Sequence, residues 1–432
     1  MARGGGDDGE AGGRERSPLV ALIGPVYAPT LIWAIGSGAF APVLVLAALQ
    51  LGYSQSLASA LAGVSGLVGV LTGPTMGRAV ARFGDRTAFI VGTSLAAVAL
   101  GTTLGVMALP HSALGRAAYL VAVVMLAVAS NLWSLARQSY VAESVPAGFR
   151  ARGMSLLGGM MRLGQLIGPG VGSVAIMLWG LPGSFALQLA TALIALAVVM
   201  AFALPDAGKS AAGAAPSSIE KDGAATHPLR PLREKADIPA TLMLSAAVVI
   251  INLVRVNRTV LIPLWGHQQG ISDGVISMTF AAAAVMDTAM FYPAGRMMDA
   301  RGRRWALLPT LILMAAGFAA LALSHGQASF VASAMLIGFG NGFGAGIIMT
   351  MGADLSPDIG RSRFLGFWQS ISQIGGTVGP FIVSGLVAAW GVYAGVWFTA
   401  VLGALGALWC AVMVPVAYRR LGTDERGMPL GE

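Results

Sequence analysis

The sequence predicts an all-α polytopic membrane protein with twelve transmembrane helices in two pseudo-symmetric six-helix bundles. Three observations carry this prediction: the composition, the length of the apolar stretches, and an internal repeat. The chain has 432 residues, of which 56% are hydrophobic and only 11% are charged, whereas a soluble domain carries roughly 25% charged residues. It therefore lacks the charge for a water-facing surface, and we expect a lipid bilayer to surround most of it.

Twelve apolar stretches have about the 20 residues that a spanning helix needs. We place them at 21–47, 55–77, 87–109, 117–140, 153–178, 183–204, 239–265, 273–296, 305–324, 329–351, 364–389 and 392–416. Residues 1–17 lack an apolar region followed by a cleavage site, so we expect a disordered cytoplasmic tail there. The small, polar stretch 205–238 predicts a cytoplasmic linker between an N-terminal half, 18–204, and a C-terminal half, 239–418, with a second cytoplasmic tail at 419–432.

The basic residues are concentrated on one predicted side of the membrane. Most of the 27 Lys and Arg residues lie in the tails, the linker and the loops after even-numbered spans, whereas the opposite loops hold Arg116. The positive-inside rule then places both termini in the cytoplasm, in a multi-pass protein of the inner or plasma membrane. A net charge of +8 divided among so many loops does not form the single basic face of a nucleic-acid-binding protein, so we expect no nucleic-acid partner.

Short patterns recur at a steady spacing in the two halves. The turn Gly52-Tyr53-Ser54 and the later pair Gly77-Arg78 recur 218 residues on, as Gly270-Ile271-Ser272 and Gly295-Arg296. Ala142-Glu143 and Gly164 recur 211 residues on, as Ala353-Asp354 and Gly375. Because each half has six spans, the repeats share one topology, and a binding site is expected between them near the middle of the bilayer.

Two loops and two spans carry further motifs. The loop after the second span of the C-terminal half contains Gly295, Arg296, Asp299, Arg301, Gly302, Arg303 and Arg304. Its counterpart in the N-terminal half contains Gly77, Arg78, Arg82, Gly84, Asp85 and Arg86, with Ala81 in the place of the acid. Small residues and proline recur on the fifth span at Gly158, Gly164, Gly168, Pro169 and Gly172, and on the eleventh at Gly375, Gly379 and Pro380.

With these motifs the chain resembles the major facilitator superfamily, and within it the drug:proton antiporter group. The resemblance implies that the loop network acts as a conformational switch that latches the two halves, and that the pattern on the fifth span marks an antiporter, hence efflux. The alternatives are ordinary positive-inside charge in the loops and ordinary close helix packing on the spans. In the first loop, Asp85 is the candidate to replace the missing acid.

Polar residues within the spans are the candidate transport residues, because a charge in the bilayer is costly and faces a cavity or a partner. Helices five and eight are neighbours across the halves in the family, so we predict that Asp287 pairs with Arg162 and couples transport to protons. Asn252, Arg255 and Arg258 share one face of the seventh span and predict a stripe that binds substrate, placed above the level of Asp287. Further candidates for substrate binding are Asn131, Asn341, Gln373 and Trp33. For each of these, the alternative is structural packing or hydrogen bonding.

The sequence therefore predicts a secondary active transporter rather than an enzyme, most simply a monomer that exports a small organic molecule or drug in exchange for protons. The alternatives are uptake or facilitated diffusion of a small metabolite, either anionic or neutral, and a receptor or scaffold that does not transport. We expect no catalytic residues, metal site or cofactor. Four membrane arginines (Arg137, Arg162, Arg255 and Arg258) against one aspartate are unusual for a carrier of cationic drugs.

Overall fold

The computed structural model describes residues 22–108, 112–144, 147–202, 236–357 and 361–428. The predicted tail 1–17 lies outside these ranges, as does the linker 205–238 except for its end at 236–238. The first half contains a π-helical turn η2 (Ile23–Tyr27) and the helices α1 (Ala28–Phe40), α2 (Val43–Gln50), α3 (Gln55–Phe83), α4 (Asp85–Ala108), α5 (Ala113–Ser144), α6 (Ala147–Trp179) and α7 (Leu181–Phe202). The second contains α8 (Ile238–Gln268), α9 (Asp273–Ala289), α10 (Phe291–Arg301), α11 (Arg304–Ala322), α12 (Gln327–Phe343), α13 (Ile347–Leu355) and α14 (Arg361–Arg420).

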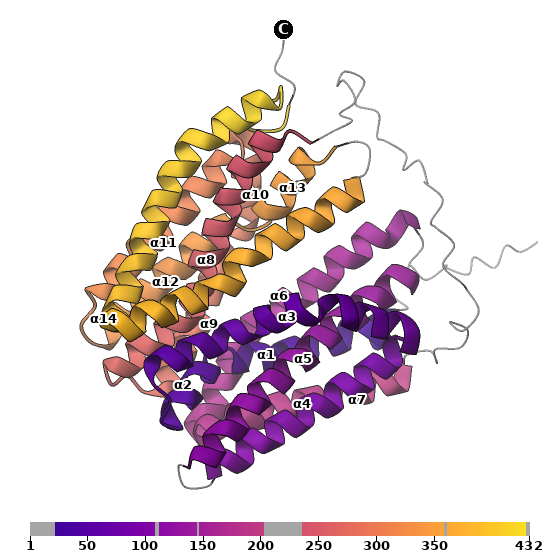
Figure 1. The fold of residues 1–432 in the computed structure, drawn as a ribbon, viewed down its shortest axis with the longest axis vertical. Helices are drawn as coiled ribbons and strands as arrows, with labels where there is room; N and C mark the ends of the chain where they lie inside the picture. The colour runs from indigo at the N-terminus through magenta and orange to yellow at the C-terminus, as the bar shows by residue number, and fades with distance from the viewer. Residues whose placement is uncertain (1–21, 109–111, 145–146, 203–235, 358–360, 429–432) are drawn as a thin grey trace, which may run out of the picture.

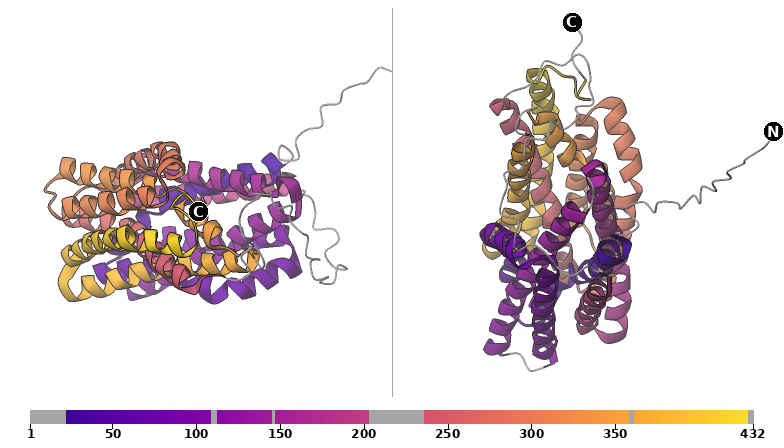
Figure 2. Two further views of the ribbon diagram at one scale, coloured as in Figure 1. Left: turned by 90° about the horizontal axis from the view of Figure 1, so that it is seen from above. Right: turned by 90° about the vertical axis from the view of Figure 1, so that its right-hand side faces the viewer.

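The described residues contain 11 helical stretches long and apolar enough to cross a membrane. The last of them, Phe364–Arg420, turns at Gly391, where φ is +80° and the backbone is not helical. It therefore makes two crossings, which brings the total to the twelve that hydropathy predicts. Figures 1 and 2 show the two bundles as separate groups of helices, indigo to magenta before the linker and rose to yellow after it.

Three predicted spans are interrupted. The span 21–47 breaks at Ala41–Pro42 between α1 and α2, 273–296 breaks at Met290 between α9 and α10, and 329–351 breaks at Gly344–Gly346 between α12 and α13. Pro42 is the N-cap residue of α2, and Gly346 has the left-handed φ of +76°. Hydropathy counts apolar residues and does not register backbone geometry, so it does not predict such breaks.

The recurring sequence patterns mark equivalent turns in the two halves. Gly52 and Gly270 have φ values of +79° and +72°, a region that glycine enters without steric cost. Ser54 and Ser272 then take the N-cap positions of α3 and α9. We call the end with Gly270 and Gly391 the outer end. The opposite end, with the α10–α11 turn at Gly302, is the inner end, which the sequence predicts to face the cytoplasm.

Small residues bring two pairs of helices into backbone contact. A Cβ at Gly168 of α6 would overlap the carbonyl oxygen of Ile35 in α1, and one at Gly172 would lie 2.7 Å from the Cβ of Ala39. In the second half, a Cβ at Gly375 of α14 would overlap the carbonyl oxygen of Val249 in α8. Close approach of this kind holds helices together in lipid.

The remaining residues of the two small-residue patterns follow the same arrangement, with one exception. Gly164 lies against Ala34, and a Cβ added at Gly379 would lie 2.8 Å from Asn257 Oδ1. Pro169 and Pro380 are buried inside their helices. The exception is Gly158, where an added Cβ would meet nothing within 4 Å. The expectation that it packs against a neighbouring helix is therefore wrong for this conformation.

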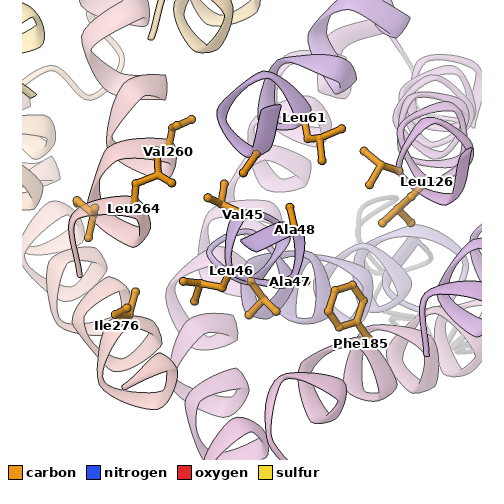
Figure 3. Packing of buried hydrophobic residues seen from close by; sticks show 14 of the residues in the cluster. Val45, Leu46, Ala47, Ala48, Leu61, Leu126, Phe185, Val260, Leu264 and Ile276 are labelled. Atoms are coloured by element: carbon orange, nitrogen blue, oxygen red, sulfur yellow. The ribbon is translucent and has the colours of Figure 1, made fainter. Parts of the chain in front are cut away.

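The two halves touch at the outer end. Ser56 Oγ of α3 lies 3.1 Å from Ser384 Oγ of α14, and Ser173 of α6 donates to the carbonyl oxygen of Gly274 over 2.8 Å. Between them, the short helix α2 presents Val45, Leu46, Ala47 and Ala48 to α3, α5 and α7 on one side and to α8 and α9 on the other (Figure 3). We call this apolar contact the outer seal.

The inner end is open. Hydrogen bonds that link the halves, such as Ser56–Ser384, Ser173–Gly274 and Ser277–Pro169, lie toward the outer end instead. In Figure 1 the halves diverge from the outer end, where α2 and α9 lie, toward the ends of α6 and α13. The structure is thus closed at the outer end and open at the inner end.

The glycine contacts give a first prediction. Replacing Gly168 with Ala forces a Cβ against the backbone of α1, and overpacking of this kind costs about 1–3 kcal/mol of stability. We expect a lower midpoint of thermal unfolding in detergent. The control is Gly158→Ala, which has open space and should leave the midpoint unchanged or raise it, because Ala is the better helix former. Equal losses in both variants would contradict the packing role of Gly168.

Candidate functional site

An ion pair lies in the middle of the second half. Arg258 Nη1 of α8 lies 3.4 Å from Asp287 Oδ2 of α9, and Asn341 Nδ2 of α12 donates to the same carboxylate oxygen. The side chains of Arg258 and Asp287 are 26% and 13% exposed. Three helices therefore converge on Asp287, as its cost in lipid requires, and its second oxygen, Oδ1, is buried without a hydrogen-bond partner in the described residues.

The prediction that Asp287 pairs with Arg162 is wrong, because Asp287 pairs with Arg258. Arg258 lies ten residues from the outer end of α8 and Asp287 fourteen residues from the outer end of α9, so their heights differ by only about 6 Å at 1.5 Å per residue. An arginine side chain covers that difference, and the expectation that Arg258 lies too high was wrong. Arg162 instead places its guanidinium 4.8 Å from the ring centre of Phe291, across the interface of the halves.

A third arginine extends the group toward the inner end. Arg255 lies one turn from Arg258 on α8 and donates from Nη2 to the carbonyl oxygen of Asn341 over 3.5 Å. It interacts electrostatically with Asp287, Arg258 and Arg162. Its Nε is buried and has no hydrogen-bond partner among the described residues. Arg255 and Arg258 thus share one carboxylate, and Arg162 adds a third positive charge beside Arg255.

A polar cavity of about 180 Å³ adjoins these arginines on the inner side, and we call it the inner cavity. Its lining comes from both halves and, among the described residues, contains no carboxylate: Arg162, Asn252, Arg255, Gly344, Gly346, Ile348, Met349, Gln369, Ser372 and Gln373. Asn252 donates to the carbonyl oxygen of Ser372. The predicted residues Arg162, Asn252, Arg255 and Gln373 are therefore brought together here.

A larger cavity of about 340 Å³ lies one helical turn further out, and we call it the central cavity. Gln165 of α6 and Arg258 of α8 line it, each three residues beyond the arginine that lines the inner cavity. Most of the remaining lining is small or apolar: Ser37, Gly38, Ala41, Pro42, Pro169, Thr259, Ile262, Phe280, Ala283, Ala284, Ala334 and Gly338. The two cavities are stacked between the halves.

Two predicted substrate residues lie elsewhere. Trp33 is 4% exposed and stacks on Trp133 with ring centres 4.5 Å apart. Asn131 donates to the carbonyl oxygens of Ala127 and Ser65, over 2.9 and 3.3 Å. Both pack within the first half and line neither cavity, so these two predictions are corrected. The predicted residue Asn341 does reach the site, through Asp287.

Sequence reasoning also missed cavity residues. Gln369 has a signal that could have found it, because it lies four residues before Gln373, on the same face of α14. Phe280 and Ala284 carry no such signal, since an apolar residue facing a cavity looks the same in sequence as one facing lipid.

The second signature loop forms an ion-pair network at the inner end. Arg303 contacts Asp354 at the end of α13 through two hydrogen bonds, of 2.9 and 3.4 Å. Tyr418 donates to the same carboxylate over 2.7 Å. Arg304 lies 3.3 Å from Glu425, whose pKa is raised by burial. These contacts all join parts of the second half, so in this conformation the network fastens that half rather than latching it to the other.

Asp299 is peripheral to this network. Its side chain is 80% exposed and 4.0 Å from Arg303, so it contributes little to holding the loop arginines in this conformation. In the same loop, Arg296 and Arg301 lie over Tyr292 and Trp305, and Gly302 has a φ of +102°.

In the first signature loop, Gly84 ends α3 with a φ of +89°. Asp85, the candidate substitute for the missing acid, is buried at the start of α4. Arg82 lies over Phe83, while Arg78 and Arg86 also make contacts.

The network gives a second prediction. Asp354→Asn leaves Arg303 without its carboxylate, and because Arg303 is only 10% exposed, we expect a loss of about 1.5–3 kcal/mol. Asp299→Asn is the matched control and should cost less than about 0.5 kcal/mol, as exposed ion pairs do. Thermal unfolding of the purified variants measures both, and a larger loss for Asp299→Asn would restore it as the centre of the network.

The sequence matches the family model described as Major Facilitator Superfamily over residues 30–256 and 243–428. Two relatives named "Probable quinate permease", from Aspergillus flavus and Aspergillus oryzae, are each 29% identical over 123 residues. Those residues are 28% of this chain and 22% of each relative, so the chain matches less than a quarter of the relatives' length.

Solved structures of transporters share the fold. A POT family transporter in complex with a thioalcohol-conjugated peptide has a TM-score of 0.68 at 12% identity, covering 92% of this chain and 96% of that one. A D-xylose-proton symporter has a TM-score of 0.66 at 16% identity, covering 96% and 100%. At such identities, the likeness shows the fold alone.

Proposed function

The chain belongs to the Major Facilitator Superfamily, and we propose that this transporter carries a small organic anion across the cell membrane by alternating access. The observation that carries the proposal is the inner cavity, which Arg162 and Arg255 line from the two halves and which no carboxylate of the described residues lines. Arg255 has a buried Nε without a hydrogen-bond partner in the described residues, and a buried cation is costly unless it is paired. The Arg162 side chain is exposed at the same cavity. An anion bound between these arginines supplies the missing partner and touches both halves at once.

The charge of the whole site supports the same substrate class. Arg162, Arg255 and Arg258 outnumber Asp287 by three to one, which leaves a net charge of +2. In a site of low dielectric, like charges a few ångströms apart repel each other by several kcal/mol, so a cationic drug is disfavoured. The relatives named as quinate permeases agree with this reading, since quinate is a carboxylate.

Asp287 is the proposed proton-coupling residue, with Arg258 as its partner in place of Arg162. Protonation of Asp287 neutralises the carboxylate, weakens its bond to Arg258 and raises the net charge of the site by one. An anion then binds more tightly, and by linkage the anion also strengthens the binding of the proton. Positive coupling of this kind favours cotransport of a proton and an anion in the same direction.

In the transport cycle that we propose, the inner end and the outer end open in turn. With both termini in the cytoplasm, as the positive-inside rule predicts, the described conformation is open to the cytoplasm and closed by the outer seal. Binding of the anion between Arg162 of the first half and Arg255 of the second draws the inner ends together. The halves then separate at the outer seal, and we propose that a single chain completes this cycle as a monomer.

The second candidate is proton-driven export, in which proton and substrate exchange. The small-residue pattern of α6, from Gly164 to Gly172, favours it through the resemblance to drug:proton antiporters. In this structure these glycines pack against α1, and a transporter needs this packing whether it exchanges or cotransports its substrates. Exchange further requires that protonation of Asp287 weaken substrate binding, opposite to the linkage described above.

The test is transport by the purified protein in proteoliposomes that contain a pH-sensitive dye. We would offer organic anions, quinate among them, each beside its uncharged amide, with and without an imposed proton gradient. We expect the anions alone to move, with protons following in the same direction. Asp287→Asn should abolish the proton movement while anion exchange continues.

Arginine variants complete the test. Arg162→Gln and Arg255→Gln each remove a charged contact worth about 1.5–3 kcal/mol, so the apparent affinity should fall by about 10- to 100-fold. Arg426→Gln, which changes an arginine beyond α14 that is 54% exposed, is the control and should transport normally. Equal transport of anions and amides would refute the anion proposal, and proton movement opposite to the anion would establish exchange.

A further inference from the structure

We infer that the substrate is an amphiphilic anion that binds in two parts, with its anionic group in the inner cavity and its apolar body in the central cavity. This inference rests on the proposed function and names the substrate class of that same site. Four observations carry it: the sizes of the cavities, their alignment, the contrast in their linings, and the break in the helix between α12 and α13.

The size of the inner cavity limits what it can hold. At about 180 Å³, it is smaller than the roughly 300–1,000 Å³ of ligand pockets, so it accommodates a head group rather than a whole metabolite. The central cavity, at about 340 Å³, falls within that range. The rest of the ligand therefore has a place of its own.

The alignment makes one ligand span both cavities. On α6, Arg162 lines the inner cavity and Gln165 the central one; on α8, Arg255 and Arg258 do the same. Each pair is three residues apart, so the cavities are offset by about 4.5 Å along the helices. This offset equals the length of a few covalent bonds, which is the distance that separates a carboxylate from the ring or branched body of the same molecule.

The linings differ in the way that an amphiphile requires. The inner cavity has Arg162, Arg255 and amide side chains, which donate hydrogen bonds to a carboxylate. The central cavity has Phe280, Ile262 and alanines, which are suited to an apolar body. Its few polar groups, such as Ser37 and Gln165, are placed to orient that body.

The break between α12 and α13 adds donors to the inner cavity. Gly344 allows the approach of Arg255, since a Cβ there would overlap its Nη2. Gly346, with φ at +76°, is the N-cap residue of α13, and no side chain caps that helix. The N–H of Ile347 bonds to the carbonyl oxygen of Gly344, so the N–H groups of Ile348 and Met349 and the helix dipole are left to face an anion. Both glycines line the cavity beside Arg255, whose buried Nε has no hydrogen-bond partner in the described residues.

The ion pair of Arg258 and Asp287 lies at the boundary. Arg258 lines the central cavity, while its partner Asp287 is held by Asn341, whose carbonyl oxygen binds Arg255. A ligand that fills both cavities passes this ion pair. Binding of the ligand therefore affects Asp287 through Arg258 and Asn341, which contact its carboxylate directly.

The test is calorimetric binding to the protein in nanodiscs of zwitterionic lipid. The probes are cyclohexanecarboxylate, acetate and uncharged cyclohexanecarboxamide. We expect cyclohexanecarboxylate to bind at least about tenfold more tightly than acetate, because its ring leaves water, and at least about tenfold more tightly than the amide, because the amide lacks the charge.

Two variants separate the two parts of the site. Ala284→Leu fills the central cavity and should remove the preference for the ring while changing acetate affinity less than about twofold. Arg255→Gln should weaken both anions by about tenfold or more. Ala404→Leu, at an exposed position of α14, is the control and should leave the binding of all probes unchanged.

Each contrary result has its own meaning. Equal affinity for the two anions, or no effect of Ala284→Leu on the ring preference, would overturn the two-part site and leave anion transport standing. If Arg255→Gln leaves the affinity for both anions unchanged, the proposed function is overturned as well. The experiment is repeated with anionic lipid: unchanged binding supports the inference, and loss of binding would assign the inner cavity to a lipid headgroup.

Discussion

Direct backbone contact of α6 with α1, and of α14 with α8, is the constraint on which the rest of the structure depends. Lipid tails are as apolar as leucine side chains, so the hydrophobic effect does not hold helices together inside a bilayer. Gly168 and Gly375 replace it with close packing. Each contact joins a helix that carries an arginine of the site to the body of its half, so the arginines are held by a rigid bundle.

The charged group in the middle is tolerated because most of its members have partners. Asp287 has Arg258 and Asn341, and Arg255 has the carbonyl oxygen of Asn341. The remaining imbalance lies where the two halves meet, at Arg162 and Arg255. In the proposed cycle, this excess of positive charge between the two halves binds an anion and senses its presence by the same interaction.

The sequence predicts the crossings well, because hydropathy and the spacing of glycines are local properties. It also predicts that Arg255, Asn252 and Gln373 are functional candidates, because polar residues in lipid are conspicuous. The partner of Asp287 was predicted wrongly, since the choice between Arg162 and Arg258 depends on heights and side-chain lengths in three dimensions. Trp33 shows the same difficulty: an aromatic residue in a span packs equally well against a substrate or against another tryptophan.

The breaks in the helices lie beyond sequence reasoning of this kind. Gly344 and Gly346 look like two more small residues in a chain with 59 glycines. Their effect, a helix that ends and begins again at a cavity, depends on the left-handed backbone of Gly346 and the close approach of Arg255. Both features depend on the packed arrangement of the helices around α8.

The outer seal has an electrical consequence. Val45, Leu46, Ala47 and Ala48 are all buried and offer no side-chain donor or acceptor to a line of water molecules, the path by which protons hop. A bare ion would lose its hydration there, at a cost of tens of kcal/mol in a medium of low dielectric. This layer therefore insulates the membrane while the inner cavity is open, and the voltage and the proton gradient of the proposed cycle are not lost through it.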